Sequence, residues 1–533
     1  MDNNFTYLNY AETGFFSRLV TDYLSNKPEI KPFYGYAPTA EGLSAAIDER
    51  NKYPVNRGVL VSALKRQYQD LTAFPAATGN IERLLGEDTF TVCTAHQPNL
   101  LTGYLYFVYK ILHAIKLAEQ LNALHPDKHF VPVYYMGSED NDLEELGTFR
   151  FRGEKYVWDA AGQTGAVGRM DTASLKPLLH KLFKLFGPPG KYCTDLQDML
   201  TAAYIRNKTI GGATQYLVNE LFGRYGLVVL DPDDAILKST FIPVMQDELL
   251  NQRAVTIIGK QIEHLGGHYK IQAHPREINL FYLADQLRER IEKKGEGYAL
   301  VNTEIQWTKE EILKELREHP ERFSPNVMLR GLYQETILPD VAFIGGGAEV
   351  AYWLQLKTVF QHYGVFYPNI HLRQSVLWIP AAQSKLRRQL EFSVAEIFKA
   401  ELDLVREFVA KHSDDDWQTA DETTAIESIF QKLKLKATSV DLTLTAAAEA
   451  ALVKMKRQLV ELEKKMMRSE KRKMQVQMDR INRLKTTLFP NNSLQERVEN
   501  FMEYYLEYGP SFFDILKEGM QTLTPQFLVV EAI

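Results

Sequence analysis

Apolar runs and polar turns alternate most clearly between residues 89 and 145. Residues 89–93 (TFTVC) and 130–136 (FVPVYYM) are short apolar runs rich in β-branched and aromatic side chains, and each predicts a buried strand. Between them, apolar residues recur with the period of a one-sided helix at Leu105, Val108, Ile111, Leu112, Ile115 and Leu121. Strand, helix and strand in this order predict a right-handed crossover between two parallel strands.

A polar cluster follows each of these two strands. The first would lie beside the amino terminus of the predicted helix, where free backbone N–H groups attract phosphate or carboxylate; it comprises His96, Gln97, Asn99 and Thr102. The second would hold an ammonium group, sugar hydroxyls or Mg²⁺; it comprises Ser138, Glu139, Asp140 and Asp142. Ligands of parallel sheets bind at the carboxyl ends of the strands, so the two clusters predict one pocket for a nucleotide or a zwitterion. The alternative is that both are structural, because a serine followed by acidic residues also caps helices.

A second informative stretch runs from residue 323 to residue 380. Residues 341–344 (VAFI) predict a buried strand, and the three glycines at 345–347 let the backbone bend and approach a ligand before a helix begins near Ala348. Residues 366–373 would close the sheet. Polar groups near this turn that would complete the pocket are Arg330, Gln334, Glu335 and Glu349.

The rest of the first 322 residues adds less chemistry. Residues 1–85 predict helices at 15–24, 41–51 and 60–71, and residues 149–222 and 255–322 predict two insertions between core strands. Residues 225–230 predict a further buried strand, followed by Asp231 and Asp233. These two carboxylates either contact a ligand or start the next helix.

Long charged helices are predicted from residue 383 onward. One spans 384–412, and a longer one spans 442–488 with the apolar spacing of a coiled coil, which slips before Met474. Residues 454–485 contain 12 basic and 4 acidic residues; we expect a solvated helix face there, with nucleic-acid or nucleotide-phosphate binding as the alternative. Ser493 and Glu496 form a capping-box pattern that predicts a helix through Phe501 and Tyr505.

Composition narrows the function classes. With 533 residues, the chain is expected to form about three or four structural units. A net charge of -6 argues against a protein that coats nucleic acid, and two cysteines, Cys93 and Cys193, suit a reducing cytoplasm. We find no signal peptide, transmembrane run, phosphate loop, nucleophile elbow or zinc spacing, and the spacing of His264, His268 and His274 matches no standard metal site. No metal site, zinc, flavin or NAD is expected, and no membrane partner.

Several runs together resemble the cysteine-adding enzymes of bacillithiol biosynthesis. They are residues 94–97 (TAHQ), 101–106 (LTGYLY), 138–142 (SEDND), 226–234, 323–354, 488–491 (LFPN) and 494–497 (LQER). The resemblance covers nearly the whole chain. The sequence departs from the family where Ala95 replaces a frequent glycine and Asn141 replaces a frequent histidine.

The resemblance implies an α/β fold: a Rossmann-like parallel sheet like the catalytic domain of class I aminoacyl-tRNA synthetases, with two inserted α+β subdomains and an antiparallel helical coiled coil that forms a homodimer. The expected units are a helical lead-in with the first half of the core (1–148), a first insertion (149–224), a core return (225–254), a second insertion (255–322), the second half of the core (323–382), the coiled coil (383–510) and a tail packed on the core (511–533). It also implies bound ATP or ADP, with an ADP region near the carboxyl-terminal helices.

The implied reaction joins the carboxyl group of cysteine to the amine of glucosaminyl-malate. Since a free carboxylate and an amine do not condense readily in water, activation by ATP is expected, with Mg²⁺ possible, and a carboxylate would act as general base. The expected catalytic residues are Glu139, Asp140 and Asp142. The expected binding residues are His96, Gln97, Asn99, Thr102, Gly103, Tyr106, Ser138, Arg330, Gln334, Glu335, Gly345, Gly346, Glu349, Tyr352 and Trp353, with a second, ADP-binding set of Ser384, Asn491, Asn492, Arg497 and Tyr505. The alternatives are another amino-acid-activating ligase or transferase, and a coiled-coil adaptor that binds nucleic acid.

Overall fold

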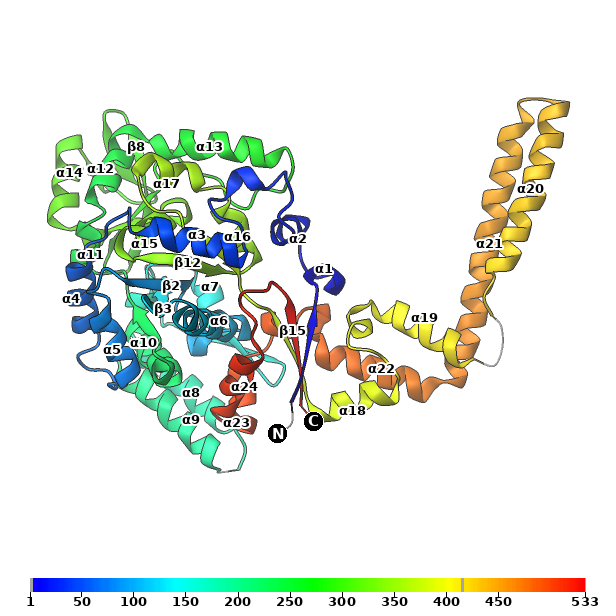
Figure 1. Cartoon of the computed structure of the whole chain (residues 1–533), viewed down its shortest axis with the longest axis horizontal. Helices are drawn as coiled ribbons and strands as arrows, with labels where there is room; N and C mark the ends of the chain where they lie inside the picture. Colours follow the sequence, from blue (N-terminus) through cyan, green and yellow to red (C-terminus); the bar gives the residue numbers. More distant parts are fainter. Residues whose placement is uncertain (1–2, 189, 414–416, 533) are drawn as a thin grey trace.

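A five-stranded parallel sheet forms the core of the protein (Figure 1). The structure is a computed structural model that describes residues 3–188, 190–413 and 417–532. The strand order is β13-β12-β2-β3-β6, and the four pairings are parallel. The bounds are β2 (Thr89–His96), β3 (His129–Met136), β6 (Val228–Leu230), β12 (Asp340–Gly345) and β13 (Asn369–Leu372). The predicted parallel sheet is confirmed.

The chain winds first to one side of β2 and then to the other. After β2 it adds β3 and β6, and it later returns to place β12 and β13 on the opposite side of β2. The carboxyl ends of β2 and β12 therefore flank the point at which the winding reverses. Sheets of this kind bind their ligands there, so the fold itself marks a site.

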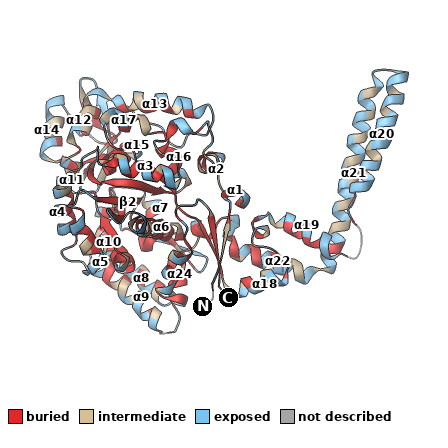
Figure 2. Ribbon diagram, viewed as in Figure 1, coloured by how far each residue is buried: buried red, intermediate tan, exposed pale blue. Residues whose placement is uncertain are grey.

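Helices cover both faces of the sheet, whose strands are buried except for the half-buried His96 and His129 (Figure 2). Helices α3 (Ala40–Arg50) and α6 (Leu105–Leu124) share a core with Phe90 and Val92 of β2. Alternate residues pack on the other face with α15 (Val327–Ile337), α16 (Gly347–Trp353) and α17 (Lys357–Tyr363). The two-residue alternation of a strand thus sends Tyr134 of β3 toward α6 and Tyr135 toward α15.

The two ends of the described chain meet in a separate three-stranded sheet. Its order is β1-β15-β14, with β1 (Asn3–Leu8) antiparallel to β15 (Phe527–Ala532), and β15 parallel to β14 (Val376–Ile379). The sequence predicted only helices and turns in this first segment, so β1 corrects that prediction. The remaining amino-terminal helices are α1 (Tyr10–Thr13), α2 (Arg18–Leu24), α4 (Arg57–Gln67) and α5 (Pro75–Arg83).

Two insertions interrupt the core strands. The first holds the hairpin of β4 (Thr148–Phe151) and β5 (Glu154–Val157), preceded by α7 (Leu143–Leu146) and followed by α8 (Lys176–Phe183), α9 (Lys191–Thr201) and α10 (Ile210–Phe222). The second contains α11 (Ala235–Ser239), α12 (Ile242–Asn251), α13 (Arg253–Gly266) and α14 (Lys309–Glu318) around a five-stranded sheet. Its strand order is β10-β9-β8-β7-β11, with β7 (Leu280–Ala284), β8 (Leu287–Lys294), β9 (Gly297–Leu300), β10 (Gln306–Trp307) and β11 (Phe323–Pro325). Strand β11 was expected in the core, but it pairs antiparallel with β7.

A helical arm projects from the core (Figure 1), as predicted. Its long antiparallel pair is α20 (Ala420–Val440) and α21 (Leu444–Lys473), and the helices at its base are α18 (Ala381–Gln389), α19 (Glu401–His412) and α22 (Gln475–Leu488). The break between α21 and α22 falls at Met474, where the apolar spacing slips. The single helix predicted over 384–412 is wrong. The chain breaks at Glu391, whose φ of 58° is left-handed, because this turn buries Phe392, Ile397 and Phe398.

The segment after the arm also differs from the prediction. Ser493 and Glu496 do not cap a helix; α23 (Phe501–Tyr508) begins later, with Asn500 as its N-cap, and α24 (Ser511–Gly519) follows. The Glu496 side chain is instead fully buried against Arg373. A local pattern therefore gave way to a long-range ion pair.

Part of the basic run at 454–485 has structural partners. Lys456 pairs with Glu427 of α20, and Glu463 pairs with Arg406 of α19 at 2.6 Å. Lys485 is largely buried and donates to the carbonyl oxygens of Ile397 and Lys399, both at 2.8 Å. These contacts connect the helices of the arm to one another.

Candidate active site

The three polar turns predicted from the sequence meet in one cavity of about 330 Å³. The end of β2 contributes His96 and Gln97, the turn after β3 contributes Glu139 and Asp140, and the glycine turn after β12 contributes residues 346–349. The cavity lies where the winding of the sheet reverses and has the size of a small-molecule site. Other predicted residues that line it are Tyr106, Arg330, Tyr352 and Arg497.

The first insertion holds the acidic turn against the cavity. The amide of Gly168 donates to the Ser138 carbonyl at 2.9 Å, and the amide of Val167 donates to the Asp140 carbonyl at 2.7 Å. A Cβ atom at Gly168 would lie only 2.5 Å from the Ser138 carbonyl oxygen, so a side chain there would displace the turn. The backbone of residues 138–140 is thus fixed by a segment that the sequence did not connect to it.

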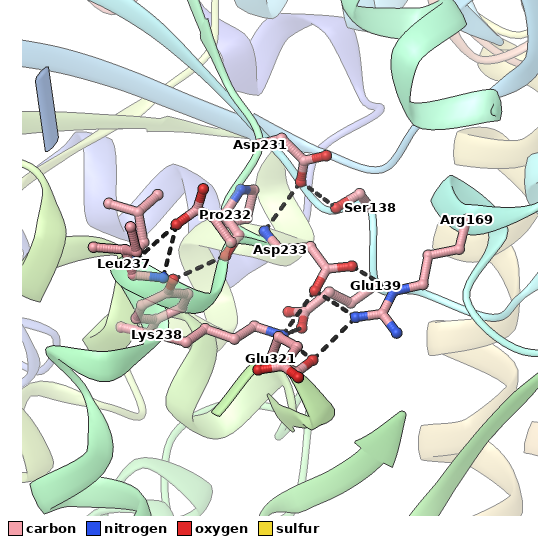
Figure 3. A network of polar contacts seen from close by, with 12 residues as sticks. Ser138, Glu139, Arg169, Asp231, Pro232, Asp233, Leu237, Lys238 and Glu321 are labelled. Carbon is pink, nitrogen blue, oxygen red and sulfur yellow. Dashed lines mark hydrogen bonds and ion pairs between the residues drawn. The ribbon is translucent and has the colours of Figure 1, made fainter. Parts of the chain in front are cut away.

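A buried network of charges lies behind this turn (Figure 3). Lys238 forms ion pairs with Glu139 and Asp233, and it donates to the Glu321 carbonyl oxygen at 3.0 Å. Arg169 donates two hydrogen bonds to the Asp233 carboxylate, of 2.6 and 2.8 Å. Side chains from both insertions are therefore joined to the cavity wall at Glu139.

Burial and charge determine the ionisation of this network. Burial raises the pKa of Glu139, and the Lys238 ammonium opposes that shift. Burial and the nearby Asp233 raise the pKa of Asp231 to about 7, although Ser138 donates to its carboxylate at 2.5 Å. Burial would also raise the pKa of Asp233, but Lys238 and Arg169 outweigh it and lower the pKa to about 2. Asp231 and Asp233 thus belong to this network, while Asp234 caps α11.

Asp140 presents the half-buried carboxylate of this wall. The Gln97 side-chain amide donates to it at 3.1 Å, so the predicted polar clusters contact each other directly. Arg288 of β8 lines the same region and donates to the Asn141 side chain at 2.9 Å. The cavity therefore has an acidic end built from the β3 turn and closed by the second insertion.

Three cations form the basic end of the cavity, and two of them, Lys110 and Arg373, are buried. Lys110 of α6 pairs with Glu349 and donates to the Ala95 carbonyl at 2.9 Å. Arg373 pairs with Glu496 through two hydrogen bonds of 2.7 Å. The third cation is Arg330 of α15. Burial and these cations lower the pKa of His96 well below its ordinary value, so its imidazole is neutral.

The amino terminus of α6 differs from the expected anion site. The amide of Leu105 donates to the Glu499 carbonyl at 2.9 Å, and the Asn500 side chain donates to the carbonyls of Leu101 and Gly103 at 2.9 and 2.5 Å. One N–H group and two carbonyl groups near this end of α6 are therefore occupied by the carboxyl-terminal segment. The Gly346 amide is likewise occupied, because it donates to Glu349 at 2.8 Å.

Nine of the expected site residues lie outside the cavity lining. Asp142 caps α7, Ser138 binds Asp231, and Trp353 packs in the core against Phe343 with ring centroids 4.5 Å apart. Gln334 and Glu335 are also outside the lining: Gln334 donates to Glu335 and Asp340 at 2.9 and 3.1 Å, and it accepts a hydrogen bond from the cavity residue Arg330 at 3.4 Å. The remaining members of this set are all buried: Asn99, Thr102 and Gly103 lie in the turn after β2, and Gly345 is the last residue of β12.

The residues expected to bind ADP are not gathered around the cavity. Ser384 donates to Glu531 at 2.8 Å, Tyr505 packs against Phe513, and Asn491 and Asn492 form a turn with left-handed φ values of 55°. Arg497 is the member of this set that lines the cavity. Two of the five residues thus have structural partners, and two others form a turn.

Several cavity residues were missed from the sequence. They are Lys110, Tyr135, Arg288, Ser324 and Arg373. Lys110 falls between the apolar positions of the predicted helix, where a polar side chain is expected to face solvent, and Tyr135 falls within a predicted buried strand. Arg288 reaches the cavity because the second insertion packs beside the core, and Arg373 reaches it because β13 is an edge strand of the core sheet. Neither position can be predicted from the residues next to it in sequence. A basic residue buried at the end of a strand is the general feature that could have drawn notice to Arg373.

The fold and the cavity define a Rossmann-like α/β protein with a coiled-coil arm and a polar small-molecule site. The domain described as "Bacillithiol biosynthesis BshC, N-terminal Rossmann-like domain" matches residues 4–374, and the corresponding "C-terminal coiled-coil domain" matches residues 376–532. The chain belongs to the bacillithiol biosynthesis BshC family, and the resemblance seen in the sequence is confirmed.

Curated relatives match over nearly the full length. A protein of Christiangramia forsetii named "Putative cysteine ligase BshC" is 41% identical and covers 98% of each chain. The protein of the same name from Flavobacterium johnsoniae is 40% identical, covering 98% of this chain and 99% of the relative. A solved structure, titled as a "putative arginyl t-RNA synthetase" from Campylobacter jejuni, is 10% identical and covers 81% of this chain and 99% of that one. Its TM-score of 0.21 is too low to support an argument.

The described part of the chain shows neither a membrane-crossing helix nor a cluster of metal ligands. Among the residues that the structure covers, no helix combines the length and apolar character needed to cross a bilayer. Within the same described ranges, no group of three or more His, Cys, Asp or Glu side chains could hold a metal ion.

Proposed function

We propose that the cavity joins the carboxyl group of cysteine to the amine of glucosaminyl-malate, through a carboxyl activated by ATP. The observation that carries this proposal is the division of the cavity into an acidic end and a basic end. Glu139 and Asp140 form the acidic end, and Lys110, Arg330 and Arg373 form the basic end. The relatives are named cysteine ligases, which agrees with an amide-forming reaction.

The acidic end suits the amine. An ammonium group is stabilised by carboxylates, and the attacking amine must lose a proton as the amide forms. Asp140 is the candidate general base, because its carboxylate lines the cavity and makes a hydrogen bond with the neutral amide of Gln97. Glu139 is held by Lys238, which suits it to binding the substrate.

The basic end suits negative charge on the activated acid. Positive groups placed where charge develops stabilise a transition state without reorganising. Lys110 and Arg373 are fixed by their carboxylate partners and would stay in place during the reaction. Neutral His96 would take part only through hydrogen bonds.

The direct test incubates purified protein with cysteine, glucosaminyl-malate and ATP and follows the thiol-containing amide by mass spectrometry. Product that depends on all three reactants is expected. A parallel arm replaces cysteine with serine or alanine and measures ATP–pyrophosphate exchange. Exchange with other amino acids and none with cysteine would favour a different amino-acid-activating ligase. The absence of product and of exchange in every arm would overturn the proposal.

Two further features are proposed for the whole protein. The arm would join two copies of the chain, because its exposed face carries apolar residues such as Val453 and Val460, which are 66% and 50% exposed. The protein would work in the cytoplasm, since Cys93 and Cys193 are buried free thiols.

A further inference from the structure

The basic end of the cavity has one positive charge without an acidic partner. Glu349 pairs with Lys110 and Glu496 pairs with Arg373, so these two cations are compensated. Arg330 is half-buried as a residue, and its guanidinium donates to neutral groups, the Tyr352 hydroxyl at 2.5 Å and the Gln334 side-chain oxygen at 3.4 Å. No carboxylate of the described chain lies within 4.0 Å of it. Burying a charge without a partner is unfavourable, and a bound anion would compensate it.

Two buried hydroxyl groups of the same cavity lining are also without partners. Tyr135 is 1% exposed and Ser324 is 0% exposed. Neither hydroxyl has a hydrogen-bond partner among the residues described. Both residues line the cavity. The Tyr135 ring also lies 5.6 Å from the Arg330 guanidinium carbon. Since buried polar groups are almost always paired in folded proteins, groups of this kind on a cavity wall point to a ligand.

The donors come from separate elements of the fold. Tyr135 is at the end of β3, Ser324 is in β11 of the second insertion, and Arg330 is in α15. The Nε atom of Arg373, at the end of β13, is buried and also lacks a partner within the described chain. The guanidinium offers only donors and one net positive charge, and each hydroxyl can turn its O–H group toward the same acceptor, so the group suits an oxyanion better than an ammonium.

We propose that Arg330, Tyr135 and Ser324 form a subsite for an oxyanion of the substrates. The oxyanion is either a carboxylate of the malyl group or a phosphoryl group of the nucleotide, which share the same acceptor chemistry. The inference rests on the proposed ligase function and adds Tyr135 and Ser324 to the residues that contact substrate. It places the anionic part of the ligand beside the Arg330 guanidinium.

The test compares wild-type protein with Y135F, S324A and Y109F by titration calorimetry with malate and, separately, with pyrophosphate. Y109F is the matched control, because the Tyr109 hydroxyl is also buried and unpartnered but does not line the cavity. Loss of one hydrogen bond to a charged group should weaken binding roughly 10-fold in Y135F and S324A. The thermal midpoint of Y135F should equal that of wild type, since this hydroxyl has no partner to lose, whereas a structural hydroxyl would lower it.

The two ligands identify the source of the oxyanion. A loss confined to malate assigns the subsite to a carboxylate, and a loss confined to pyrophosphate assigns it to a phosphoryl group. Failure of the wild type to bind either ligand overturns the subsite, as do unchanged affinities in Y135F and S324A or an equal loss in Y109F. Amide formation is measured separately: Tyr135-dependent binding without product overturns the ligase proposal alone, and equal product yield from wild type and Y135F overturns the subsite alone.

Discussion

Lys238 compensates the buried negative charge at the wall of the cavity. It is 1% exposed and compensates Glu139 and Asp233, which are buried with it. Its three contacts join the acidic turn, the β6 loop and the backbone at Glu321. Because removing one partner leaves uncompensated buried charge, the network is more sensitive to loss of Lys238 than a surface ion pair would be.

Replacing Lys238 by methionine should therefore lower the free energy of unfolding by about 3–5 kcal/mol. The matched control is K434M, which removes an exposed lysine paired with Glu449 and should change it by less than about 1 kcal/mol. Urea denaturation followed by circular dichroism measures both. Equal effects in the two variants would mean that the buried network contributes no more than an exposed pair.

Asp140 and Asp142 provide a second comparison between neighbouring residues. D140N removes the proposed general base and should reduce kcat/KM for amide formation by about 100-fold or more, because general base catalysis contributes about 10²–10⁴-fold. D142N keeps an N-cap residue on α7 and lies outside the cavity lining, so its activity should stay close to wild type. Steady-state kinetics on both variants decides; wild-type activity in D140N would remove Asp140 from the reaction.

At the scale of elements, two buried acids meet where α15 leads into β12: Glu335 is in α15, and Asp340 is the first residue of β12. Burial and the neighbouring Asp340 raise the pKa of Glu335 well above its ordinary value, and burial raises the pKa of Asp340 to about 6. Gln334 donates to both carboxylates, and Arg50 lies near enough to oppose the shifts. The folded protein thus retains a proton that the unfolded chain would release.

This pair predicts a pH dependence of stability. Acids with raised folded pKa values stabilise the fold fully below their unfolded pKa near 4 and lose this contribution as pH rises through the folded pKa, here about 6 for Asp340. E335Q cannot ionise, so its stability relative to wild type should increase between pH 5 and pH 8, by up to about 1.4 kcal/mol per pH unit. Urea midpoints at pH 5, 6.5 and 8 test this. A constant difference would show that the pair does not hold the proton; E311Q, in an exposed capping box, is the control.

The sequence predicted those elements whose signal is local. The core strands, the helix period of α6 and the break at Met474 each follow from a few consecutive residues. Strand β1 was missed because its pairing partner, β15, lies at the other end of the chain. Glu496 was assigned to a cap because its real partner, Arg373, is distant in sequence.

The same distinction holds for the cavity. Residues in turns after strands, such as His96 and Asp140, could be named because parallel strands place their carboxyl ends together. Tyr135 could not, since the residue before a turn looks like any interior strand residue until its hydroxyl is found without a partner. Gln334 was wrongly expected to line the cavity, because its side-chain amide donates instead to the buried acids Glu335 and Asp340.

At the scale of the whole molecule, the cavity and the arm are separate. Residues that line the cavity come from the core, the insertions and the segment up to Arg497, whereas α20 and α21 project away from the core (Figure 1). The lining residues named above belong to one chain, and none of them is in α20 or α21.

This separation leads to a prediction for the proposed dimer. Val453 and Val460 lie seven residues apart on α21, so they face the same direction. Their exposed fractions are 66% and 50%. Placing two glutamates there in V453E/V460E should shift the protein from dimer to monomer in sedimentation velocity, because burial of the introduced charges is unfavourable. Q458E, an exposed polar position on the same helix, should remain dimeric.

The monomeric double variant should retain amide-forming activity per chain, since its cavity is intact. A monomeric wild type would refute the arm as a dimer interface, and an inactive monomer with unchanged thermal stability would show that the second chain contributes to the site.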